Sequence, residues 1–143
     1  MAPDPFNLER FVDAQAPVID DVYDELRRGR KSSHWMWFVF PQFAALGHSP
    51  MARRYGIASL AEARAYLAHP VLGPRLVECC RLLLKVQAGS IEEILGRPDN
   101  MKFRSCLTLF MQAAPDQAVF SQCLDKYYGG EADARTVMLC AQG

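Results

Sequence analysis

The residues best suited to chemistry in this 143-residue chain lie in two separate segments. The first is an aromatic block, residues 33–43, which reads Ser-His-Trp-Met-Trp-Phe-Val-Phe-Pro-Gln-Phe and holds five of the fifteen aromatic residues. Aromatic rings stack on flat ligands such as nucleobases, and His34 and Gln42 can add polar contacts. Because the block has neither helical nor alternating periodicity, it predicts one of two structures. It is either a pocket wall with Trp35 and Trp37 as stacking rings, or a hydrophobic plug that closes the core.

The second segment is a helix predicted over residues 99–113. Polar residues recur along it at spacings of three and four, so they share one helix face. A solvent-exposed face usually carries more charge, so this composition indicates a partly buried polar cleft. The alternative is that the hydroxyls bond back to backbone carbonyls of their own helix. The face consists of Lys102, Ser105, Thr108 (or Leu109) and Gln112.

Charge is distributed unevenly around the aromatic block. Residues 1–26 carry seven acidic residues and one basic residue, whereas residues 27–61 carry six basic residues and no acidic one. Arginine suits phosphate and carboxylate groups. The basic segment therefore predicts an anion-binding rim, unless its side chains pair with the acidic N-terminal helix.

Known catalytic signatures are missing from the chain. It has no Gly-x-Ser-x-Gly, His-Glu-x-x-His, P-loop or Gly-x-Gly-x-x-Gly motif. The three histidines lie in separate segments without ligand spacing, so we expect no metal and no cofactor. If the site performs a reaction, His34 is the expected general acid or base, because its ordinary pKa lies near neutrality.

The composition indicates one globular domain, residues 1–143, because half of the residues are hydrophobic and 22% are charged. Sixteen basic residues balance sixteen acidic ones, so binding to a nucleic-acid polymer is not expected. No apolar run approaches the roughly 18 residues of a membrane span, and residues 1–5 do not resemble a secretion signal. Five cysteines without a Cys-x-x-Cys pair predict buried, reduced thiols and a cytoplasmic location.

Helix signals begin near the N-terminus. Asn7 is expected to cap a helix whose apolar positions continue to Leu26, with a kink or break at Pro17. Ser49 before Pro50 predicts the start of a short helix.

Further helices are predicted by capping boxes and by apolar patterning. Ser59 with Glu62 and Ser90 with Glu93 each match a capping box. Asp133 is expected to cap a last short helix.

The predicted helix over residues 70–87 is apolar except for one stripe, which indicates a helix buried nearly all round. We therefore predict it as the central helix, with Leu76, Cys80 and Leu83 buried. One β-like run, residues 37–40, is the exception to a nearly all-helical pattern. The expected fold class is all-α: a compact multihelical domain around the helix at 70–87.

Several long motifs resemble the DUF1810 family. They are Gly-Arg-Lys-Ser-Ser-His-Trp-Met-Trp-Phe-Val-Phe-Pro-Gln at 29–42 and the segments 46–55, 62–76, 98–105 and 108–110. The likeness covers about residues 6–140 and implies a compact, mostly α-helical fold with no established activity. Some members carry the label calpastatin, which denotes a disordered repeat inhibitor and does not fit this globular composition. Cys106 departs from the family pattern, where a serine is expected.

These observations favour a pocket for a small anionic ligand, a class that includes nucleotides. In it, His34 and Lys102 would converge on one cleft. The alternative is a non-enzymatic interaction module that docks a partner through the aromatic block and the basic segment. The sequence leaves open whether the protein is an enzyme, and also its oligomeric state. The expected ligand-binding residues are Trp35, Trp37, Gln42, Lys102 and Ser105.

Overall fold

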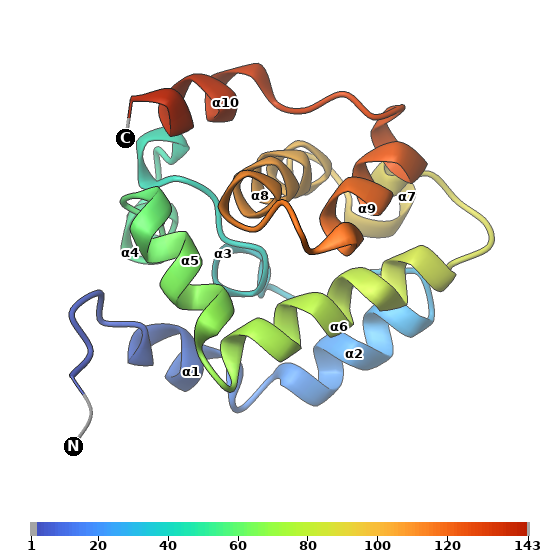
Figure 1. The fold of residues 1–143 in the computed structure, drawn as a ribbon. Helices are drawn as coiled ribbons and strands as arrows, with labels where there is room; N and C mark the ends of the chain where they lie inside the picture. The colour runs from blue at the N-terminus through green and yellow to red at the C-terminus, as the bar shows by residue number, and fades with distance from the viewer. Residues whose placement is uncertain (1–2, 143) are drawn as a thin grey trace.

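The computed structural model describes residues 3–142, so Met1, Ala2 and Gly143 of the predicted domain lie outside it. Within these residues the chain forms ten α-helices, one 3-10 turn (η1) and no strand, which confirms the all-α class (Figure 1). The elements are α1 (Glu9–Gln15), α2 (Ile19–Arg27), α3 (Met36–Val39), η1 (Ala44–Leu46), α4 (Pro50–Arg54), α5 (Leu60–Ala68), α6 (Leu72–Lys85), α7 (Ile91–Leu95), α8 (Asp99–Ala113), α9 (Ala118–Tyr128) and α10 (Ala134–Ala141).

The helix at the centre of the fold is α8, which is seen end-on in Figure 1 and packs against α5, α7, α9 and α10. The sequence predicts α6 as the central helix. Its residues Leu76, Cys80 and Leu83 are buried as expected, but α6 lies at one side of the molecule next to α2. The buried polar residue Thr108 is compatible with the central position of α8 because its hydroxyl is satisfied within the helix. It donates to the Arg104 carbonyl oxygen (2.8 Å).

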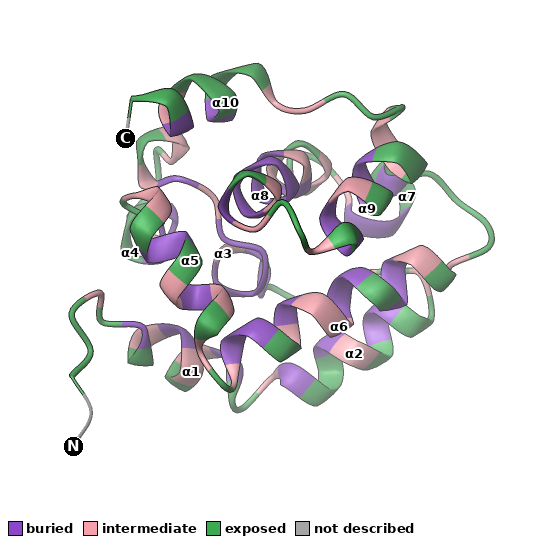
Figure 2. Cartoon of the chain, viewed as in Figure 1, coloured by how far each residue is buried: buried purple, intermediate pink, exposed green. Residues whose placement is uncertain are grey.

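The aromatic block closes the core rather than forming a strand. Residues 37–40, predicted as β-like, belong to the single-turn helix α3 and the residue after it. Trp35 and Phe40 are each 1% exposed, and the centroid of the Phe40 ring lies 4.7 Å from that of Phe103 on α8. Figure 2 shows α3 as part of the buried interior. The hydrophobic-plug interpretation is therefore correct for the tryptophan and phenylalanine rings of the block, except for the half-buried Trp37.

The N-terminal cap is supplied by a different residue from the one predicted. Asn7 has a left-handed φ of 52° and does not cap α1. The carboxylate of Asp4 instead accepts from the amides of Leu8 (2.7 Å) and Glu9 (3.0 Å). These amide hydrogen bonds, with that from Glu9 the larger contributor, lower the pKa of Asp4. The break expected at Pro17 is confirmed, since α1 ends before it and α2 begins after it.

The other predicted caps are largely present. Ser49 and Asp133 each accept from a backbone amide in the first turn of their helices, and Ser90 and Glu93 form a complete capping box. The box at Ser59 is only half formed. Its hydroxyl accepts from the Glu62 amide, but the Glu62 carboxylate binds elsewhere.

All five cysteines are free and buried. Burial raises the pKa of Cys79, Cys80, Cys106 and Cys140, so their thiols stay protonated at neutral pH. Across residues 3–142, none of the helices has the length and apolar character needed to cross a bilayer.

Candidate functional site

The strongest candidate site is a surface hollow between the first turns of α8 and α10, which we call the α8–α10 hollow. It has a volume of about 180 Å³. Figure 1 shows α10 lying across the side of the molecule that α8 and the η1 segment form. The hollow is lined by Gln42, Leu46, Pro98, Met101, Lys102, Ser105, Asp133 and Arg135.

A second, much smaller cavity adjoins the first and shares Gln42 and Lys102 with it. Trp37 and Tyr55 line its aromatic side. Its volume is about 10 Å³, which is room for roughly one water molecule. A nucleobase therefore does not fit into this cavity beside Trp37.

The structure brings four of the predicted ligand-binding residues together. Gln42, Lys102 and Ser105 line the α8–α10 hollow, and Trp37 lies in the small cavity next to it. Trp35 is not part of this group. Its ring is buried, and its indole N–H donates to Glu25 Oε1 (3.0 Å).

His34 is exposed and lines neither of these two cavities. Its loop is held by Glu25, which accepts from the amides of Ser32 (2.7 Å) and Ser33 (3.0 Å) and from the Ser33 hydroxyl. Burial by itself would raise the pKa of Glu25, but the hydrogen bonds from Ser33, Ser32 and Trp35 outweigh it and lower the pKa to about 2. The predicted convergence of His34 with Lys102 is not seen at the hollow.

Two cations face the α8–α10 hollow. Lys102 Nζ lies 4.0 Å from Asp99 Oδ1, at the limit of an ion pair, while Asp99 Oδ2 is held more closely by Lys31 (3.1 Å). Arg135 is exposed, and within residues 3–142 its guanidinium forms neither an ion pair nor a hydrogen bond. The opposing charge at the hollow is Asp133, whose carboxylate accepts from the amide and hydroxyl of Thr136 (3.0 and 2.5 Å). The hollow therefore has an excess of positive charge.

The basic segment 27–61 does not supply these cations. Arg27 pairs with Asp24 of its own helix, and Lys31 pairs with Asp99 at the start of α8. Arg135, which the sequence did not single out, is the arginine that lines the hollow, a role that the sequence assigned to the basic segment 27–61. The one available signal was its position in the first turn after the Asp133 cap. That signal does not separate it from the other basic residues.

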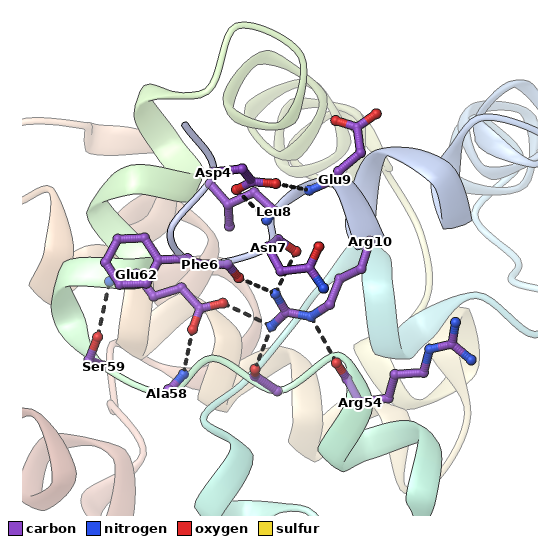
Figure 3. Close-up of polar contacts among 11 residues, drawn as sticks. Asp4, Phe6, Asn7, Leu8, Glu9, Arg10, Arg54, Ala58, Ser59 and Glu62 are labelled. Atoms are coloured by element: carbon purple, nitrogen blue, oxygen red, sulfur yellow. Dashed lines mark hydrogen bonds and ion pairs between the residues drawn. The ribbon is translucent and has the colours of Figure 1, made fainter. Parts of the chain in front are cut away.

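A different basic residue, Arg10, is fully committed to the fold (Figure 3). Its Nε donates to the Arg54 carbonyl oxygen, and its Nη1 donates to those of Phe6 and Asn7. Its Nη2 donates to the Gly56 carbonyl oxygen and to Glu62 Oε2 (2.9 Å). We call this group the Arg10 clasp. All five of its N–H groups are bonded, so Arg10 has none left for a ligand.

A further feature is the arrangement of side chains that could bind a metal ion. Among residues 3–142, no group of three or more histidine, cysteine, aspartate or glutamate side chains is placed to hold an ion.

The fold and the hollow together define an all-α protein with a small basic depression on its surface. The chain belongs to the DUF1810 family, described as proteins of unknown function, whose model matches residues 5–140. It is similar to the conserved hypothetical protein Rv1873 from Mycobacterium tuberculosis, known from a crystal structure. The two share 59% sequence identity with a TM-score of 0.95, over 96% of this chain and 99% of that one. No curated protein matches the chain.

Proposed function

We propose that this protein binds a small oxyanion, a phosphate or carboxylate group, in the α8–α10 hollow. The observation that carries the proposal is the pair of cations there: Lys102, held only loosely by Asp99, and Arg135, which has no carboxylate partner within residues 3–142. A phosphate or carboxylate would supply the missing negative charge to both. Arginine can also bind such a group in a bidentate manner.

Neutral groups around the cations support the same ligand class. The side-chain amide of Gln42 and the hydroxyl of Ser105 line the hollow, and the Ser105 hydroxyl makes only a long bond to the Met101 carbonyl oxygen (3.4 Å). The first turns of α8 and α10 border the hollow, but each already carries a carboxylate, Asp99 on α8 and the Asp133 cap on α10, so the attraction for an anion rests on the side chains rather than on the helix dipoles.

The size of the hollow sets a limit on the ligand. Typical small-molecule pockets have volumes of roughly 300–1,000 Å³. A hollow of about 180 Å³ suits the anionic group of a ligand rather than a whole nucleotide. The proposal therefore does not include base stacking on Trp37.

We also propose a cytoplasmic location for the protein. Five free, buried cysteines support a reducing cytoplasm as the location. We expect neither a nucleic-acid polymer nor a membrane as a partner, because the chain has no net charge.

The test is a thermal melt with increasing inorganic phosphate. Binding stabilises the folded state by RT ln(1 + [L]/Kd), so phosphate at one hundred times Kd adds about 2.7 kcal/mol. We expect Lys102→Ala and Arg135→Ala each to abolish most of this gain. Lys85→Ala is the matched control, because Lys85 is an exposed lysine on α6 that lines neither cavity. A phosphate-dependent gain that survives in both hollow variants would refute the proposal.

A further inference from the structure

A second surface hollow shares the side chain of Arg135 with the α8–α10 hollow. This second hollow, which we call the α10 groove, has a volume of about 160 Å³. The two share Arg135, and they also meet through neighbouring residues of η1, since Leu46 lines the first and Ala45 the second. The α10 groove is lined by Ala45, Arg135, Met138, Leu139 and Gln142.

Exposed apolar side chains gather along this path. Among residues 3–142, the large hydrophobic side chains that are exposed are Met101 (51%), Val137 (38%) and Met138 (63%). Met101 lines the α8–α10 hollow, and Met138 lines the α10 groove. Val137 lines neither of them. Two of these three side chains therefore flank the pair of cations.

This placement joins a charged surface to an apolar one. Solvent-exposed methionines beside a hollow are typical of binding surfaces, because the flexible thioether side chain can adapt to an apolar ligand. Arg135 stands where the two hollows meet, so a ligand whose anionic group it binds would have its next atoms beside Met138 and Leu139.

We infer that the ligand is an amphipathic organic anion. Its phosphate or carboxylate head binds between Lys102 and Arg135, and a short alkyl tail lies along the α10 groove against Ala45, Met138 and Leu139. The inference rests on the proposed function and adds the class of ligand to it. The two volumes taken together reach the lower end of the range for small-molecule pockets, which a bare phosphate would not fill.

The experiment measures, by calorimetry, the affinity of the full chain for inorganic phosphate and for ethyl, butyl, hexyl and octyl phosphate below their micelle concentrations. Burial of each methylene group should strengthen binding about twofold to fourfold. We expect the affinity to rise with chain length and to level off once the groove is filled. In Met138→Gln the rise should be lost while the affinity for inorganic phosphate stays unchanged.

Val137→Gln is the matched control, since it removes an exposed apolar side chain from the same helix without altering the groove, and it should keep the full rise. If inorganic phosphate binds through Lys102 but the affinity does not change with chain length, the inference is overturned and the proposed function stands. A rise that Lys102→Ala leaves intact also overturns it, because the tail would then bind without its head in the hollow. If neither inorganic phosphate nor any alkyl phosphate binds, the proposed function fails and the inference fails with it.

Discussion

Arg10 and Arg135 carry the same guanidinium group in opposite situations. Arg10 donates all five of its N–H groups to four backbone carbonyls and to Glu62. Arg135 donates none within residues 3–142 and faces a hollow that it shares with Lys102. The first guanidinium ties together chain segments that are far apart in sequence, whereas the second is left for something outside the chain.

The difference shows that donor satisfaction, rather than charge, separates a structural cation from a candidate binding cation. The Arg10 side chain is 15% exposed and that of Glu62 is 4% exposed, so the clasp is largely shielded from water, and its loss would leave the Glu62 carboxylate with the Ala58 amide but without its cation. The exposed side chain of Arg135 is solvated already. Each type therefore predicts a different response to mutation.

An arginine whose N–H groups are all hydrogen-bonded within the fold should be needed for stability. Of the variants considered, Arg10→Ala should therefore give the largest loss of stability. Removal of one partner from a buried ion pair costs about 3–5 kcal/mol, and the lower end applies here because Arg10 is partly exposed and Glu62 keeps its hydrogen bond from the Ala58 amide. We expect a loss of this size in the free energy of unfolding, measured by urea denaturation.

The companion variant for Arg10 is Glu62→Gln. Combined with Arg10→Ala, it should recover part of the lost stability because the stranded charge is gone. A loss below about 1 kcal/mol for Arg10→Ala would show that the clasp contributes no more than an exposed pair.

A second fully satisfied group, Glu25, should make stability depend on pH. Its pKa of about 2 in the folded state lies below the ordinary value of 4.5. Its contribution is therefore fully present above pH 4.5 and is lost as the pH falls from 4.5 towards 2. At 1.36 kcal/mol per pKa unit the loss should amount to at most about 3 kcal/mol.

Glu25→Gln isolates this effect. The difference in unfolding free energy between the natural chain and the variant should shrink across that acidic range, measured by denaturation at a series of pH values. A difference that stays constant with pH would mean that the hydrogen bonds from Ser33, Ser32 and Trp35 do not depend on the carboxylate's charge.

The smallest effect on stability is expected at the hollow. Lys102→Ala and Arg135→Ala remove partly or fully solvated cations that the fold does not use, so each should change the unfolding free energy by less than about 0.5 kcal/mol in phosphate-free buffer. The double variant should change the unfolding free energy by no more than the sum of the two single changes. A loss of 2 kcal/mol or more at Arg135, seen by the same denaturation, would place this residue with Arg10 among the structural cations.

Local features of the fold could be predicted from the sequence because their causes are local. Ser49 before Pro50 and the reciprocal pair of Ser90 with Glu93 depend on residues within one turn, and both caps are present. The prediction for Asn7 was wrong because Asn7 has a left-handed φ and lies one residue before the N-cap, Leu8, while Asp4 accepts from the amides at the start of α1. That exchange depends on a turn that residue type alone does not reveal.

The candidate site could be predicted only in part. Trp35 and Trp37 are two residues apart and of the same type, yet among residues 3–142 only the Trp35 indole finds an acceptor, Glu25. Lys102 and Ser105 stand out because their helix face has little charge. Arg135 carries no such local mark, since its role arises only when α10 lies across α8.

The buried cysteines can be used to measure how often parts of the fold open. A thiol that is shielded and protonated reacts with a labelling reagent only when the chain around it opens, so its labelling rate measures how often that opening occurs. Cys80, Cys106 and Cys123 are 0% exposed between α6, α8 and α9, so they react only after the core comes apart. Cys140, 9% exposed on α10, needs only that one helix to lift. Because α10 carries Arg135, the reactivity of Cys140 relative to that of Cys80, Cys106 and Cys123 reports how long the hollow stays assembled.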